Sequence, residues 1–195
     1  MTGAAGLACP SMEIRCERLL LRPWRRGDEG ALIRYANNRN VWRNLRDRFP
    51  HPYTIADAES WIRRNEETNE PTMSFAIVLE GEPVGAVGLE HREDVDRRTL
   101  ELGYWLGEPF WGRGLATEAA RAVADYAFAT FDVERLEAGV FEWNPASGRV
   151  LEKAGFQLEA RLRKSVFKDG QLIDRLLYAR LRIDEKTGSP ERTRR

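Results

Sequence analysis

The stretch YWLGEPFWGRGLATEAARAVADYAF, residues 104 to 128, decides the fold. It passes from an aromatic, strand-like segment through two closely spaced glycines, Gly112 and Gly114, into an alanine-rich segment. Apolar residues recur there at helical spacing, which predicts a helix over about 114–130. Its buried side would consist of Leu115, Ala119, Val123, Tyr126 and Ala127. The free backbone N–H groups at such a helix start favour an anion.

Several kinds of loop could contain these glycines. A P-loop requires Lys and then Ser or Thr after its last glycine, but Gly114 is followed by Leu115 and Ala116. A dinucleotide fingerprint requires a third glycine at position 117, which is Thr117. Two interpretations are left: a plain turn, or a cradle of N–H groups for a pyrophosphate, to which Arg113 adds a charge-assisted contact.

The segments on either side predict a mixed α/β domain. Upstream, strands are expected at 17–24, at 98–106 and in two segments joined by a turn at 80–83; helices are expected at about 27–36 and after Thr54, the N-cap. Downstream, a strand at 135–143 precedes a short helix capped by Asn144 and a hairpin that turns at Asp169 and Gly170. This order predicts a mostly antiparallel sheet with one crossover through the glycine-bearing helix.

The bulk composition favours one globular domain and excludes some classes of partner. The 195 residues carry 31 Lys and Arg against 31 Asp and Glu, so the zero net charge argues against direct nucleic-acid binding. No apolar run approaches the about 20 residues of a membrane span. The only cysteines, Cys9 and Cys16, fit a reducing cytoplasm. We expect a disordered extension at 1–11, a domain at 12–183 and a polar tail at 184–195, with Met1 or Met12 as the start.

Two motifs together carry a family resemblance. GYWLGEPFWGRGLATEAARAVADYAF, followed by NPASGRVLEKAGF, resembles the acetyl-CoA-dependent N-acetyltransferases of the GNAT superfamily. The likeness is closest to the RimJ/RimL branch, which acetylates ribosomal-protein N-termini, and it covers roughly residues 15 to 182. It implies the GNAT acyl-CoA N-acyltransferase fold, an α/β (α+β) domain with a mixed, mostly antiparallel sheet flanked by helices. It also implies acetyl-CoA as cosubstrate and no metal.

The resemblance assigns the cofactor contacts. The family's pyrophosphate pattern, Q/R-x-x-G-x-G/A, falls on residues 111–116, where Gly114 and Ala116 match and Trp111 stands in place of Gln or Arg. The expected cofactor-binding residues are Trp105, Leu106, Trp111, Gly112, Arg113, Gly114, Leu115, Ala116, Thr117, Asn144, Ser147 and Lys153. Asn144 is also an N-cap. Lys153 is a candidate contact to an adenosine phosphate, and the favoured alternative is a solvated helix lysine.

The implied chemistry needs a base for the amine, a donor to the carbonyl oxygen and a proton donor to the leaving thiolate. We expect Glu101 to be the base, acting through water; the alternative is an ordinary strand residue paired with an arginine. The tyrosine that many GNAT enzymes use as the acid is replaced here by Leu151, so Ser147 is the candidate acid, or else a residue that only packs. The oxyanion donor would be a backbone N–H near Trp105 or Leu106.

Three functions are compatible with these residues. The first is acetylation of a protein or peptide N-terminal α-amine. The second is acetylation of a small amine such as an amino acid, a polyamine or an antibiotic, and the third is a non-catalytic acyl-CoA-binding module. The sequence does not choose between the first two. His51 and His91 are too far apart in sequence to suggest a metal site, and the edge of the last hairpin could pair in a homodimer.

Overall fold

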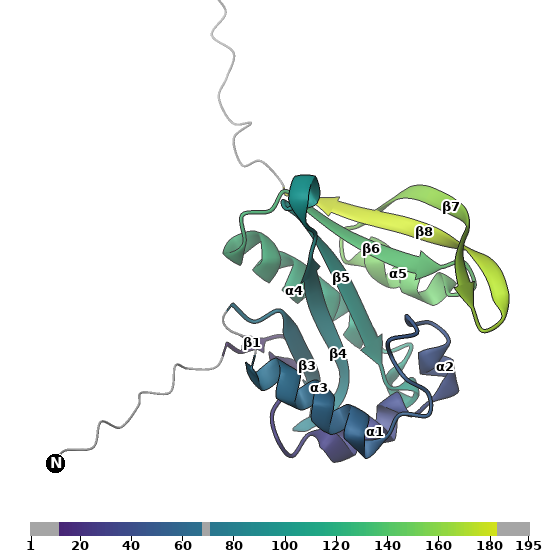
Figure 1. Cartoon of the computed structure of the whole chain (residues 1–195). Coiled ribbons are helices and arrows are strands. Elements are labelled where there is room, and N and C mark those ends of the chain that lie inside the picture. Colours follow the sequence, from purple (N-terminus) through teal and green to yellow (C-terminus); the bar gives the residue numbers. More distant parts are fainter. Residues whose placement is uncertain (1–11, 68–70, 183–195) are drawn as a thin grey trace, which may run out of the picture.

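The computed structural model describes residues 12–67 and 71–182 (Figure 1). The extension expected at 1–11 and the tail expected at 184–195 lie outside these residues. Within them, eight strands form one sheet in the order β1-β2-β3-β4-β5-β6-β8-β7. The strands are β1 (Ile14–Arg15), β2 (Leu20–Arg22), β3 (Ser74–Leu79), β4 (Glu82–His91), β5 (Thr99–Leu106), β6 (Arg135–Phe141), β7 (Gln157–Lys168) and β8 (Gln171–Leu181).

Five α-helices connect the strands of the described chain. They are α1 (Glu29–Ala36), α2 (Arg39–Trp42), α3 (Ile55–Glu67), α4 (Leu115–Thr130) and α5 (Pro145–Lys153). The α3 cap is confirmed: the Asp57 amide donates to Thr54 Oγ1 at 3.3 Å, while the Thr54 amide donates to Asp57 Oδ2 at 2.8 Å. Asn144 caps α5 by accepting from the Ser147 amide at 3.2 Å. The four-residue helix α2 was not predicted.

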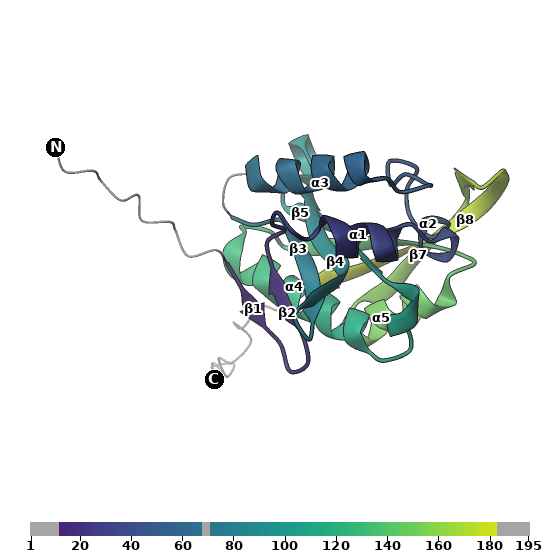
Figure 2. The ribbon, with the colours of Figure 1, turned by 90° about the horizontal axis from the view of Figure 1, so that it is seen from below.

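The helices lie on both faces of the sheet, and each face has its own core. One core packs α4 and α5 against alternate strand residues, among them Leu100, Leu102 and Leu136. The other packs α1 and α3 against residues of the opposite parity, such as Ala76 and Ala86. Figure 2 shows α3 on one side of the strands and α5 on the other. The predicted mixed α/β fold is therefore confirmed.

The sheet is incomplete between β5 and β6. These strands are parallel, as expected for the crossover through α4, but they pair only from Thr99 to Glu101, opposite Arg135 to Glu137. Beyond Glu101 the two strands diverge, which Figure 1 shows below the β5 label. All other neighbouring strands are antiparallel. A gap thus opens in the middle of the sheet, between the carboxyl ends of two parallel strands.

Both predicted tight turns are observed. Glu80 and Gly81, and likewise Asp169 and Gly170, have positive φ angles, between 51° and 87°, as a two-residue hairpin turn requires. The second turn joins β7 to β8, and β7 is the strand at the edge of the sheet. Three of its apolar side chains are exposed: Leu158, Leu162 and Phe167. The homodimer expected through this hairpin stays a prediction. Among the described residues, no helix combines the length and apolar character needed to cross a membrane.

Candidate active site

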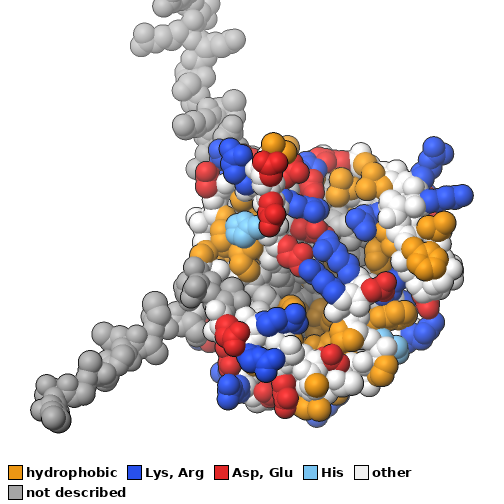
Figure 3. Space-filling view, in the orientation of Figure 1, with side chains coloured by type: hydrophobic (Ala, Val, Ile, Leu, Met, Phe, Trp, Pro, Cys, Tyr) orange, Lys and Arg blue, Asp and Glu red, His pale blue; other side chains and the backbone are white. Residues whose placement is uncertain are grey.

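A cleft of about 1010 Å³ passes through the gap in the sheet. On one side its walls come from α3 and from the loop before it; on the other they come from the start of α4 and from α5. Figure 3 shows the first side as a hollow near the middle of this face, with charged side chains of both signs around it. The cleft therefore joins the two faces of the sheet where β5 and β6 separate.

The loop before α4 presents free amides to this cleft. Gly112 and Gly114 have φ angles of 74° and 78°, and Gly114, the N-cap of α4, has no side-chain cap. Among the described residues, nothing accepts a hydrogen bond from the backbone amides of residues 112–117. A Cβ added at Gly112 would meet nothing within 4 Å. These unpaired donors at a helix N-terminus fit a phosphate or pyrophosphate.

Two side chains of this loop, Trp111 and Arg113, make contacts within the protein. Trp111 lines the cleft, but its indole N–H donates to the Leu106 carbonyl at 2.7 Å and so fastens the loop to β5. Arg113 is not among the cleft residues; its guanidinium lies over the Phe110 ring, 6.0 Å from the centroid. Its carbonyl accepts a hydrogen bond from Arg18 at 2.7 Å. The predicted charge-assisted contact of Arg113 has no support from this arrangement.

The start of α5 brings Ser147 to the cleft, together with a residue that the sequence did not indicate. The hydroxyls of Ser147 and Tyr104, from β5, are 2.7 Å apart, and the Tyr104 hydroxyl also donates to the Ser147 carbonyl at 3.1 Å. Burial raises the pKa of Tyr104, an effect larger than the opposing hydrogen bond from Ser147. The pair is therefore protonated at neutral pH. Leu151, which stands at the position of the tyrosine that the resemblance led us to look for, is fully buried.

The other expected α5 residues are also at the cleft. Asn144 and Lys153 both line it, Asn144 as the helix cap described above. The Lys153 carbonyl accepts a hydrogen bond from Arg121 of α4 at 2.5 Å, which ties the two helices together.

The two candidate oxyanion donors, the backbone N–H groups of Trp105 and Leu106, point to opposite sides of β5. The Gly107 amide donates to the Val84 carbonyl at 2.8 Å, across the pairing of β4 with β5. Because donors alternate along a strand, the Trp105 amide also faces β4, whereas the Leu106 amide faces the gap. The indole of Trp111 reaches the Leu106 carbonyl, which confirms that Leu106 faces away from β4. Leu106 is thus the one of the two residues whose N–H points into the gap.

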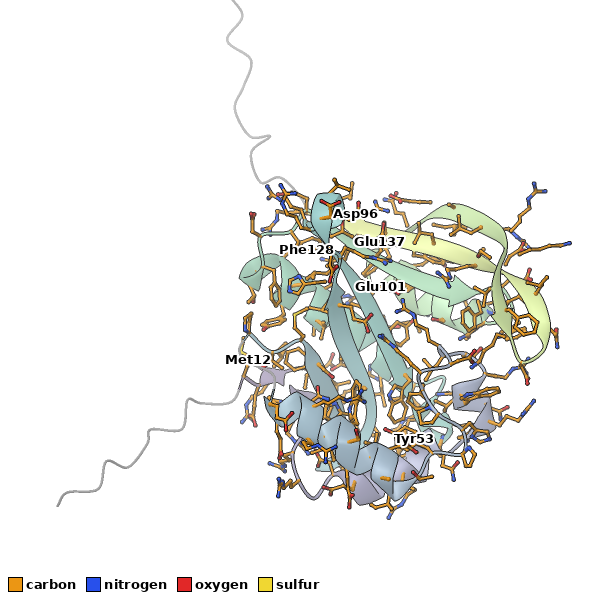
Figure 4. The ribbon with its side chains drawn as sticks, in the orientation of Figure 1. Met12, Tyr53, Asp96, Glu101, Phe128 and Glu137 are labelled. Carbon is orange, nitrogen blue, oxygen red and sulfur yellow. The ribbon has the colours of Figure 1, made fainter. Side chains whose placement is uncertain are left out.

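Glu101 lies on the opposite face of the sheet from Tyr104 and Ser147. Figure 4 shows it beside Glu137, its partner on β6. Its carboxylate forms ion pairs with Arg46, from the loop after α2, and with Arg92, at 3.0 Å. The alternative of a strand glutamate paired with arginine is thus observed, yet Glu101 also lines the cleft, with a side chain only 15% exposed. The pKa of Arg46 is lowered, first by burial and then by the charge of Arg92.

The structure brings together all the predicted site residues except Arg113. The cleft is lined by Glu101, Trp105, Leu106, Trp111, Gly112, Gly114, Leu115, Ala116, Thr117, Asn144, Ser147 and Lys153. His51 stacks on Trp42 and His91 packs on Phe131, so both have packing partners instead. No group of three or more His, Cys, Asp or Glu that could hold a metal is found in residues 12–67 and 71–182.

Sequence reasoning missed Tyr104, Arg46 and Arg175, all of which line the cleft. Tyr104 lies in the strand expected at 98–106, but nothing in the sequence indicated Ser147 as its neighbour. Arg46 and Arg175 come from a loop and from the last strand, and only the fold brings them to Glu101.

Comparison with known proteins agrees with the fold described above. The model of the family described as "Acetyltransferase (GNAT) domain" matches residues 18–157. Among curated relatives, the uncharacterized N-acetyltransferase p20 of Bacillus licheniformis is 30% identical over 171 residues, 85% of this chain and 94% of the relative. The spermidine N(1)-acetyltransferase of Escherichia coli is 29% identical over 151 residues, 77% of this chain and 79% of the relative.

One relative matches over a shorter stretch but with a higher sequence identity. The probable N-acetyltransferase YjcK of Bacillus subtilis is 44% identical over 89 residues, but the match spans 46% of this chain and about half, 49%, of that relative. Among solved structures, Mycobacterium smegmatis RimJ in complex with a CoA-disulfide superposes with a TM-score of 0.74 at 26% identity. That superposition covers 88% of this chain and 86% of the RimJ chain.

Proposed function

The chain belongs to the acetyltransferase (GNAT) domain family and is an acetyltransferase, and from this we propose that it transfers the acetyl group of acetyl-CoA to the α-amine of a protein or peptide N-terminus. The observation that carries the proposal is the cleft through the sheet, which joins a cradle of free amides and a hydroxyl pair on one face to a carboxylate on the other. The RimJ structure, similar over most of both chains, supports a RimJ/RimL-like acceptor.

When bound, acetyl-CoA supplies a thioester whose carbonyl carbon the amine attacks. The amides of residues 112–117 would hold the pyrophosphate. The N–H of Leu106 would donate to the carbonyl oxygen as it gains charge, from a strand position that β6 leaves free. The pantetheine arm would then lie along β5 as an added strand does.

Proton transfer is divided between the two faces of the sheet. Glu101 would take the proton of the attacking amine, directly or through a water, because its ion pairs with Arg46 and Arg92 keep the carboxylate at the cleft. On the other face, Ser147 would supply a proton to the leaving sulfur, and Tyr104 would support the serine hydroxyl. An α-amino group has a pKa of about 7.7–8.0, so a modest base suffices.

The test compares Glu101→Gln with Glu137→Gln. The two glutamates are neighbours, both pair with Arg92 and both are mostly buried, but only Glu101 lines the cleft. With peptides that begin with Ser, Ala, Met or Thr, we expect Glu101→Gln to lower kcat by about 10²–10⁴-fold and to keep acetyl-CoA affinity. Glu137→Gln should stay near wild type. An equal loss in both variants would mean that the arginine network, and not a base, is what Glu101 provides.

The second candidate function is acetylation of a small amine, favoured by the similarity to spermidine N(1)-acetyltransferase. The release of free thiol from acetyl-CoA is therefore measured with the peptides and also with polyamines and free amino acids. Turnover confined to peptides supports the first proposal, and turnover confined to small amines replaces it with the second.

A further inference from the structure

The face of the cleft that carries Glu101 is rich in arginine. An ion-pair network there includes arginines and glutamates in equal number, Arg46, Arg48, Arg92, Glu90, Glu101 and Glu137. It continues from Glu137 to one further arginine and one further glutamate, Arg135 and Glu159. Each of these arginines pairs with at least one glutamate of the network. The charges of these side chains therefore balance among themselves.

Arg175 is a further arginine on this face. Glu137 and Phe141 lie on the same face of β6, four residues apart, and Arg175 of β8 is the partner of Phe141 across the strands. Its stem crosses β6 over Gly139, where an added Cβ would lie 3.1 Å from Arg175 Cδ. A glycine at position 139 thus leaves room for the side chain to reach the cleft, which Arg175 lines.

Arg175 has no acidic partner of its own. Within residues 12–67 and 71–182, no carboxylate lies within ion-pair distance of its guanidinium, and no group accepts a hydrogen bond from it. Burial lowers its pKa, and so do the charges of Arg46 and Arg92. A half-buried cation beside two others, with its donors unpaired, is an unfavourable arrangement that an anion would relieve.

We propose that Arg175 binds a carboxylate of the acceptor, close to the amine that Glu101 deprotonates, and that the enzyme thereby selects acidic acceptors. A guanidinium presents paired N–H donors that match a carboxylate. The proposal rests on the acetyl transfer proposed above and narrows its substrate class. It also disfavours polyamines, because a second cationic group near Arg175 would be repelled.

The carboxylate could be an acidic side chain near a peptide N-terminus or the α-carboxylate of a free amino acid. Two matched pairs of acceptors distinguish these sources: a tripeptide amide Ser-Asp-Ala against Ser-Asn-Ala, and serine against serinamide. Each pair keeps the amine and nearly the same shape while the negative charge is removed. We expect kcat/KM for the acidic member of one pair to exceed that of its neutral partner by roughly 10- to 100-fold.

Arg175→Gln should abolish that preference and leave kcat/KM for the neutral member within about threefold of wild type. Arg175→Lys should restore part of the preference, since it keeps the charge and loses the paired donors. The control variant is Arg163→Gln, an exposed arginine of the neighbouring strand β7 that does not line the cleft. No preference in either pair, or a preference that survives Arg175→Gln, overturns the proposal.

A binding measurement keeps this test separate from that of the acetyl transfer. The N-acetylated forms of the two tripeptides are titrated calorimetrically into the wild-type chain and into Arg175→Gln. Tighter binding of the Asp peptide that is lost in the variant supports the carboxylate site even if no acceptor is turned over. Turnover of neutral peptides with equal binding of both products, and with no preference for serine over serinamide, leaves the acetyl transfer intact and removes the carboxylate site.

Discussion

The hydroxyls of Tyr104 and Ser147 are the least expected contact in the cleft. They come from residues 43 positions apart, and the two groups form a single hydrogen-bonded unit beside the gap. Because its pKa is raised, the tyrosine keeps its proton, and its neutral hydroxyl can either donate a hydrogen bond to the serine or accept one from it. A serine alone is a poor acid, so we expect the supporting tyrosine to matter for the proton that leaves with the thiol.

Tyr104→Phe keeps the ring and removes the hydroxyl. We expect kcat to fall by about 10- to 100-fold, a part of the 10²–10⁴-fold typical of acid–base groups, with little change in acetyl-CoA affinity. The control is Tyr178→Phe, which removes a hydroxyl from the same face of the sheet, close to Gly148 but outside the cleft lining. Steady-state kinetics with both substrates varied measures the effect. A pure loss of acetyl-CoA affinity would instead assign the hydroxyl to packing of α5.

At the scale of the element, α4 begins with a backbone that only glycine adopts easily. Gly114 has a φ of 78°, and an added Cβ would lie 3.3 Å from Arg18 Nη2. Gly81, in the turn between β3 and β4, has a φ of 87° and open space around it. Both Gly114→Ala and Gly81→Ala should lower the free energy of unfolding by about 1–2 kcal/mol, as left-handed backbone does for alanine.

Only Gly114→Ala should also weaken the binding of acetyl-CoA, since it disturbs the amides at the helix start. Urea denaturation and calorimetric titration with acetyl-CoA measure the two effects separately. Equal acetyl-CoA affinity in both variants would contradict the assignment of this loop to the pyrophosphate.

The elements that the sequence predicted are those with strong local signals. The helix α4, the cap at Thr54 and the turn at Asp169 each depend on residues within a few positions of one another, and all three are confirmed. The helix α2 was missed because its four residues span about one helical turn, too short for an apolar period to show.

The candidate site was predictable only where one motif contains it. The loop at 112–117 and the start of α5 are each one continuous stretch of sequence, so a motif could indicate each of them. Arg46 is 55 positions from Glu101 in the sequence, and Arg175 is 74 positions from it. No local sequence pattern predicts contacts between residues so far apart in the chain. Glu118, which is not among the residues expected on the buried side of the helix at 114–130, is half-buried because Arg18 binds it through its backbone and its guanidinium.

At the scale of the whole molecule, buried tyrosines should make stability fall at alkaline pH. Burial, with a smaller contribution from Asp57, raises the pKa of Tyr53 to about 12, and the side chain is 5% exposed. An unfolded tyrosine has a pKa of about 10, so above that pH the unfolded chain loses the proton first. Stability that is fully present below pH 10 is then lost as the pH rises toward 12.

Urea denaturation between pH 8 and pH 11.5 measures this loss. Tyr53→Phe should reduce the decline by about 2 kcal/mol at pH 11.5, the equivalent of about 1.5 pH units above the unfolded pKa. A decline of the same steepness in wild type and in Tyr53→Phe would show that other groups control alkaline unfolding.

The order of the strands has a consequence for how the protein is made. The last strand, β8, lies between β6 and β7, and it alone carries Arg175 and joins the edge strand to the rest of the sheet. In a chain growing on the ribosome, the amide loop, Glu101 and Ser147 are therefore synthesised before the final strand. Arg175 joins the cleft only after β8 has been made, so premature termination at any point before β8 yields a chain without the proposed carboxylate site.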